Sequence, residues 1–143
     1  MNEKLNRWVH NSTIKYFKDS LAPNTLIAQG EPRTGEEPSE RYELRCLGPD
    51  WSENGSEVMI HLTVNIVIRS ANTKAAPTNH NNRIGKVLPY LKCFPIKKYG
   101  GQPTDDDSFV DTFQRQGDVR TTHFDVVEPV SKIMLTTLEC DFV

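Results

Sequence analysis

The sequence contains no run of 18 apolar residues, the usual sign of a transmembrane helix, and no apolar signal region follows its first residues. We therefore expect neither a membrane-spanning segment nor secretion. Cysteine is also scarce. Cys46, Cys93 and Cys140 form an odd set without paired spacing, which favours free thiols in a reducing cytoplasm.

Charge of one sign is missing from a long central stretch, although the formal net charge is only −2. Residues 58–100 hold seven bases and no acid. They lie between residues 31–57, with eight acids and three bases, and residues 101–143, with nine acids and three bases. Mixed signs are usual on a solvated surface, so this segregation predicts complementary faces, within one subunit or between copies.

The strongest pattern in the chain runs through residues 58–69, where every second position is apolar and the alternate positions are mostly polar. Successive side chains of a strand point to opposite faces, so the pattern predicts one strand, about 40 Å long, with one buried face. The predicted core positions are Val58, Ile60, Leu62, Val64, Ile66 and Ile68.

Helical spacing of apolar residues predicts two amphipathic helices, over residues 3–22 and 78–88. Asn2 is a plausible cap for the first helix and Pro23 ends it. Pro89 should end or kink the second helix, because proline lacks the backbone N–H that a helix interior needs.

Alternation and turn residues indicate the remaining elements. Gly48-Pro49-Asp50 and Asn54-Gly55-Ser56 predict a ten-residue hairpin tip at residues 48–57, and residues 29–40 read as a loop or mobile arm. Strands are predicted over residues 25–28, 41–47, 93–99, 119–127 and 132–142, while residues 109–113 stay ambiguous. This order predicts a single α+β domain spanning residues 1–143, with a mostly antiparallel sheet, a long central hairpin strand and two helices packed on one face.

Groups that could carry a reaction are scattered. The aspartates at positions 105–107 are adjacent and diverge on an extended chain, so a solvated turn is a better interpretation than a magnesium site. The four histidines show no pair at metal spacing. Cys93 or Cys140 with His123 is conceivable as a nucleophile and base, but a buried structural cysteine is far commoner. We therefore expect no catalytic, cofactor-binding or metal-binding residues and no enzyme.

The basic block is the one stretch that resembles a nucleic-acid footprint, but few aromatic stacking residues lie within it. Complementing the acidic segments is the better interpretation. The candidate interface residues are Arg83, Lys86, Lys97 and Lys98 with Asp105, Asp106 and Asp107.

The order of elements resembles the tail-terminator (tail-completion) proteins of long-tailed bacteriophages, small neck subunits of similar length. Residues 61–69, 82–91 and 134–142 carry the likeness, which spans most of the chain as a pattern and not as a signature motif. That family has no catalytic residues. The resemblance implies a homo-oligomeric ring, typically a hexamer, at the head-proximal end of the tail tube.

The resemblance also implies partners and a location. The partners are further copies of the chain, the tail tube and the head connector; the ring belongs to the virion and assembles in the host cytoplasm, without a membrane or a cofactor. Non-specific passage of DNA through the ring stays open. So do two alternatives: a head-side connector or stopper, and a small cytoplasmic enzyme or nucleic-acid-binding protein that uses residues 69–98.

Overall fold

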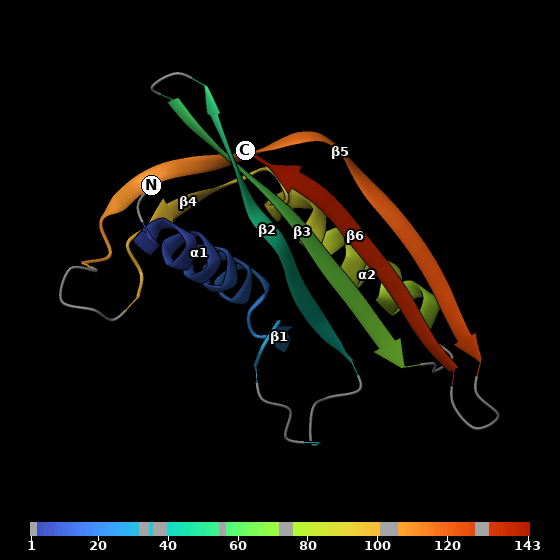
Figure 1. The fold of residues 1–143 in the computed structure, drawn as a ribbon. Coiled ribbons are helices and arrows are strands. Elements are labelled where there is room, and N and C mark those ends of the chain that lie inside the picture. The colour runs from blue at the N-terminus through green and yellow to red at the C-terminus, as the bar shows by residue number, and fades with distance from the viewer. Residues whose placement is uncertain are drawn as a thin grey trace.

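The computed structural model describes residues 3–31, 35, 40–54, 57–71, 76–100, 106–127 and 132–143. Within these ranges two α-helices accompany a six-stranded sheet (Figure 1). The elements are α1 (Glu3–Leu21), β1 (Leu26–Ala28), β2 (Arg41–Asn54), β3 (Glu57–Ala71), α2 (Ala76–Val87), the 3-10 helix η1 (Leu88–Tyr90), β4 (Cys93–Lys97), β5 (Phe109–Val127) and β6 (Lys132–Phe142). The expected cap Asn2 and residues 32–34 and 36–39 of the expected loop lie outside the described residues.

The sheet has the strand order β1-β2-β3-β6-β5-β4. Only β1 runs parallel to its neighbour, and every other pair is antiparallel. The fold is therefore α+β with a mostly antiparallel sheet, as the sequence predicts. β3 and β6 form the centre, and Figure 1 shows β5 curling from beside β6 around toward β4 and α1.

One face of β3 is the core. Leu62, Val64, Ile66 and Ile68 are all at most 1% exposed, which confirms the predicted alternation at these four positions. Ile60 is only partly buried, and the side chain of Val58 lies outside the described residues. The helices cover this same face. Side chains of α1 and α2 join these strand residues in one buried cluster, and the hydroxyl of Tyr42, on the same face of β2, donates to the carbonyl of Arg83 in α2 at 3.0 Å.

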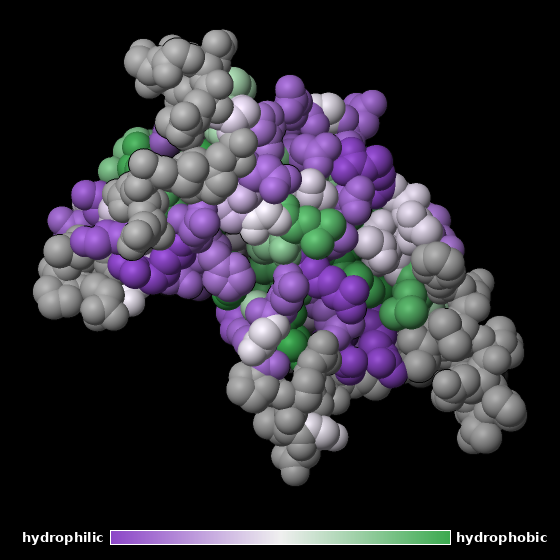
Figure 2. Space-filling model, viewed as in Figure 1, coloured by the Kyte–Doolittle hydropathy of each residue, from purple (hydrophilic) through white to green (hydrophobic). Residues whose placement is uncertain are grey.

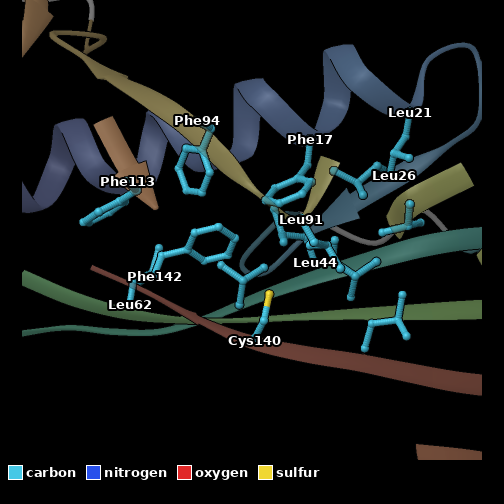
Figure 3. Close-up of a cluster of buried hydrophobic side chains, with 14 of the residues drawn as sticks. Phe17, Leu21, Leu26, Leu44, Leu62, Leu91, Phe94, Phe113, Cys140 and Phe142 are labelled. Carbon is cyan, nitrogen blue, oxygen red and sulfur yellow. The ribbon is translucent and has the colours of Figure 1, made fainter. Parts of the chain in front are cut away.

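Phe94 of β4 links the curled end of the sheet to its centre. Its ring lies 4.9 Å from that of Phe142 in β6 and 5.7 Å from that of Phe113 in β5, centroid to centroid. Phe17 and Tyr16 of α1 approach it at 5.8 and 5.1 Å. Figure 3 shows the rings of Phe17, Phe94, Phe113 and Phe142 in the space between α1 and the strands. The packed rings hold α1, β4 and β5 against the central strands.

The predicted ten-residue hairpin tip at residues 48–57 is wrong, because β2 continues to Asn54 and β3 begins at Glu57. Gly55 and Ser56, of the second predicted turn, lie outside the described residues. Asp50 pairs with His61, and the pairing extends to Asn54 and Glu57. Gly48 has a φ of +112°, and the register shifts between Leu47 and Asp50. A Cβ on Gly48 would lie 3.1 Å from the carbonyl oxygen of His61. Gly48 therefore forms a β-bulge within β2, where one extra residue is accommodated, and not a turn.

The segments at residues 109–113 and 119–127 belong to one 19-residue strand, β5. Gly117 has a φ of +80°, and the register with β6 shifts between Gln116 and Arg120. Such an irregularity bends a strand without ending it. It lets the first half of β5 pair with β4 and the second half pair with β6.

Candidate assembly surfaces

Arg83, a candidate interface residue, is used within the subunit. Its Nη1 donates to the carbonyl of Arg69 and, at 2.9 Å, to Oγ of Ser70. The guanidinium also lies 4.8 Å from the ring centroid of Tyr42, within cation–π range. These contacts hold α2 on β2 and β3.

Lys86, another candidate interface residue, lies in the last turn of α2, where a cation interacts favourably with the helix dipole.

Of the remaining charged candidates, Lys98, Asp106 and Asp107 lie beside one another in one subunit. The backbone N–H of Lys98 donates to the carbonyl of Ser108 at 2.9 Å, and the N–H of Asp107 donates to the carbonyl of Lys98 at 3.3 Å. Hydrogen bonds from Ser108 are the main cause that lowers the pKa of Asp106, and Lys98 contributes a smaller attraction. Asp105 lies outside the described residues. A base of the central stretch, Lys98, therefore lies next to acids of the C-terminal stretch within one subunit.

α1 covers the outer edge of β4 at its last residue, Lys97. Ser12 is 1% exposed; its hydroxyl donates to the carbonyl of Lys97 at 3.1 Å and accepts from the N–H of Lys97 at 2.9 Å. Asn11 donates to the carbonyl of Tyr99 at 2.9 Å. An uncovered edge strand offers free backbone groups to other chains, and these two side chains occupy such groups. In the sequence, the only sign of this contact is that Ser12 falls on the apolar stripe of the first helix.

The hairpin of β2 and β3 extends beyond the rest of the sheet. β3 pairs with β6 only from Leu62 onward, so residues 57–61 pair with β2 alone. We call residues 50–54 and 57–61 the arm. Figure 1 shows it running on past the C-terminus. Met59 on the arm is 43% exposed. The arm is a two-stranded projection with an exposed apolar side chain.

A cleft of about 330 Å³ lies at the base of the arm. Its buried lining includes Val9 of α1, Ile96 of β4 and Phe113 of β5, and its exposed lining includes Met59 and Val110. This volume is at the lower end of the range for ligand pockets. The lining is apolar apart from the start of β5, where an aspartate and a threonine contribute. We call this space the arm cleft.

The face of the sheet opposite the helices carries an ion-pair cluster. Arg120 of β5 donates to Glu139 at 2.8 Å and to Asp141 at 3.1 Å, both on β6. Thr63 of β3 donates to Asp141 at 2.7 Å. The hydrogen bonds from Arg120 are the main cause that lowers the pKa of Asp141. The cluster joins three strands.

On the surface seen in Figure 2, hydrophilic residues predominate and apolar residues gather in small patches.

A buried polar chain connects α2 to the sheet. His80 is 2% exposed; its Nδ1 lies 2.7 Å from Oγ of Ser70 and its Nε2 lies 2.7 Å from Oγ1 of Thr136. Nδ1 of His123 lies 2.8 Å from the same Thr136 oxygen. Both ring nitrogens of His80 are occupied and the ring is shielded, so a structural role fits this histidine. Ser70 is the penultimate residue of β3.

Neither Cys93 nor Cys140 is placed to act as a nucleophile with His123; Cys93 pairs with Gln114, nine residues along β5 from His123. Cys140 is fully buried, and burial raises the pKa of its thiol to about 11. It lies four residues along β6 from Thr136, the residue that His123 contacts, which corresponds to about 13 Å. Burial likewise raises the pKa of Cys46 to about 11. We call these two the shielded thiols; Cys93 is exposed, and all three are free.

Within the described ranges, no group of three or more histidine, cysteine, aspartate or glutamate side chains is arranged to hold a metal ion. None of the described helices is long and apolar enough to cross a membrane. No protein-family model matches the sequence, and no curated protein matches it as a relative. Function must therefore be argued from the geometry of the subunit.

Proposed function

We propose that this protein is a structural, non-enzymatic subunit that assembles into a ring, with six copies as the expected number. The ring sits at the head-proximal end of a bacteriophage tail tube and joins the tube to the head connector. The resemblance in element order supplies the viral context. The arm is the structural observation that supports assembly.

The arm favours association because an isolated two-stranded hairpin is only marginally stable in water. Among the residues that the structure describes, no third strand pairs with residues 57–61, and the arm exposes Met59. Contact with a neighbouring chain would bury that side chain and order the arm. A projection on one side of a subunit that meets a different surface on the next copy makes a head-to-tail contact, and such contacts close into rings when the rotation permits.

The charge pattern supports a head-to-tail contact between an acidic segment of one copy and a basic segment of the next. Residues 48–61, which contain the arm, carry three acids and no lysine or arginine, whereas residues 62–100 carry seven bases and no acid. Exposed ion pairs are each worth at most about 1 kcal/mol, so charges would set orientation and rate while apolar contacts hold the ring.

The test is the mass of the purified protein in solution, measured by mass photometry across a salt series. We expect about six times the 16.3 kDa of one chain at low salt, with dissociation as salt rises. A single-chain mass under all conditions would contradict the proposal, and a monomer that retains duplex DNA would favour the nucleic-acid alternative.

A shortened arm tests the supporting observation. Deleting Ser52, Glu53, Val58 and Met59 together removes two adjacent cross-strand pairs and leaves the register of the remaining pairs intact. We expect a folded protein that has lost the ring. The matched control is Leu88→Ser, which removes an exposed apolar side chain from η1. Equal masses for the shortened-arm protein and the wild type would exclude the arm from the contact.

A further inference from the structure

A surface histidine is connected to the interior of the subunit through two hydroxyl groups. His123 of β5 is exposed, and its Nδ1 lies 2.8 Å from Oγ1 of Thr136, which is fully buried in β6. The same oxygen lies 2.7 Å from Nε2 of His80 in α2, and Nδ1 of His80 lies 2.7 Å from Oγ of Ser70 in β3. Nη1 of Arg83 donates to that serine oxygen at 2.9 Å. We call these five residues the relay.

Arg83 sets the direction of the hydrogen bonds in the relay. A guanidinium only donates, so the oxygen of Ser70 accepts from Arg83. Within the described residues, the other group that this hydroxyl contacts is Nδ1 of His80, so the O–H of Ser70 donates to Nδ1. A neutral imidazole that accepts at Nδ1 carries its proton on Nε2. His80 therefore donates from Nε2 to Thr136.

The same accounting assigns the proton of His123. Oγ1 of Thr136 accepts from His80, so its own O–H is left to donate, and Nδ1 of His123 is the acceptor that lies within reach in the described part of the chain. His123 is thus also neutral, with its proton on Nε2. Any other assignment leaves a buried O–H of the relay unpaired, and buried polar groups are rarely unpaired.

A proton taken from solvent by His123 breaks this series of hydrogen bonds. The new N–H on Nδ1 points at Thr136, so the O–H of Thr136 loses its acceptor or turns to Nε2 of His80. In the second case the proton of His80 moves to Nδ1, and Ser70 is left with an unpaired O–H. In both cases one buried hydroxyl where α2 meets β3 and β6 has no acceptor, which is costly.

The charged groups around the relay lie on three elements. Arg83 of α2 shares Ser70 with the buried imidazole, so a positive charge on that ring would lie close to the guanidinium. β3 contributes the carbonyl of Arg69, which accepts from Arg83, and β6 has no charged residue over positions 134–138. On β5, Asp125 is two positions from His123. A carboxylate favours a charged imidazole, so Asp125 is included in the test.

We propose that the relay is an acid-sensitive latch for α2, in which protonation of His123 at the surface loosens the hold of the helix on β3 and β6. Histidine is the side chain that changes charge between pH 5 and pH 8. The hydrogen bonds of the relay need neutral rings, so the latch is closed at pH 8 and is lost as the pH falls to 5. This inference does not depend on ring formation.

The first test is the position of the proton on each ring. Nuclear magnetic resonance of the protein labelled with nitrogen-15 distinguishes a protonated from a bare imidazole nitrogen. At pH 8 we expect both His80 and His123 to carry the proton on Nε2. A proton on Nδ1 of either ring would overturn the direction assigned to the relay.

Hydrogen exchange at one fixed protein concentration tests the latch. In the wild type, the protection factors of amides in residues 80–87 of α2 should fall about tenfold from pH 8 to pH 5, the size expected for one unpaired buried hydroxyl. Amides in residues 62–68 of β3 are the internal reference and should change less.

Two substitutions at the exposed His123 separate the acceptor from the charge. His123→Asn supplies a side-chain oxygen that accepts from Thr136 and does not titrate, so the protection of α2 should be the same at both pH values. His123→Ala removes the acceptor, so protection at pH 8 should already equal the wild-type value at pH 5. The matched control is His10→Asn, at an exposed histidine of α1, which should keep the wild-type fall. Asp125→Asn should keep it as well.

The proposal fails if α2 of the wild type is protected equally at pH 5 and pH 8. It also fails if the fall persists in the His123→Asn protein, because the acid-sensitive group would then be a different one. Loss of the fall in the His10→Asn or the Asp125→Asn protein would likewise overturn it.

Discussion

Replacing Phe94 with alanine should uncouple the curled end of the sheet from its centre. The side chain is 1% exposed, and its ring contacts four aromatic rings from α1, β5 and β6. Truncating a buried phenylalanine to alanine costs about 3–5 kcal/mol, from lost burial and from the cavity that remains. Well-oriented aromatic pairs add about 0.5–1.5 kcal/mol each, so we expect the upper part of that range.

The assay is urea denaturation at one fixed protein concentration, because assembly makes apparent stability depend on concentration. A loss of 4 to 5 kcal/mol is a large share of the roughly 5–15 kcal/mol typical of a domain. Thermal melting should fall by about 2–4 °C for each kcal/mol lost. Phe94→Leu, which keeps most of the apolar volume, should recover much of the loss.

Phe109→Ala is the matched control. Phe109 lies in the same β4–β5 pairing, opposite Lys97, but is 60% exposed. Its truncation should change stability by no more than about 0.5 kcal/mol. If Phe94→Ala costs under about 1 kcal/mol, or no more than this control, the aromatic cluster does not hold the two parts together, and the reasoning is refuted.

Three further outcomes follow from burial and charge. Ile66→Asp should cost several kcal/mol, because it buries an unpaired carboxylate, whereas Asn65→Asp on the opposite face should cost less than about 1 kcal/mol; equal losses in urea denaturation would mean that both faces are covered. A thiol reagent at pH 8 should modify Cys93 rapidly and the two shielded thiols slowly, and three equal rates would contradict their burial. Arg120→Ala should remove a stabilisation that is present above the unfolded pKa of an aspartate, near 4, and is lost as pH falls through the lowered pKa of Asp141. The variant should therefore differ from the wild type at pH 7 and converge with it in acid; a constant difference would exclude this ion pair as the cause.

The sequence was most informative where one element's own periodicity decides its burial. The alternation in β3 and the apolar stripe of α1 predicted their buried faces, because a side chain's direction follows from its position along a strand or helix. The helix-breaking effect of Pro89 is equally local: α2 ends at Val87 and η1 follows. These elements were enough to predict the α+β class.

Local composition was misleading where distant pairing decides the structure. Gly48 and its neighbours have the composition of a turn, yet β3 supplies partners on both sides of the bulge, and the strand continues. Gly117 likewise lies within a strand that two different neighbours stabilise. The contact of Ser12 with Lys97 spans 85 positions, and the internal use of Arg83 depends on where Tyr42 lies. A single sequence gives no direct signal for a contact between residues that are so far apart along the chain.

The closure of β4 by α1 has a consequence for synthesis. Ser12 precedes Lys97 in the chain, so the helix that protects this edge leaves the ribosome long before the strand does. When β4 emerges, its cover is already available, and the interval in which a bare edge can pair with another nascent chain is short. A circular permutant that placed α1 after β6 would reverse this order and should aggregate more during expression, even if its final fold were the same.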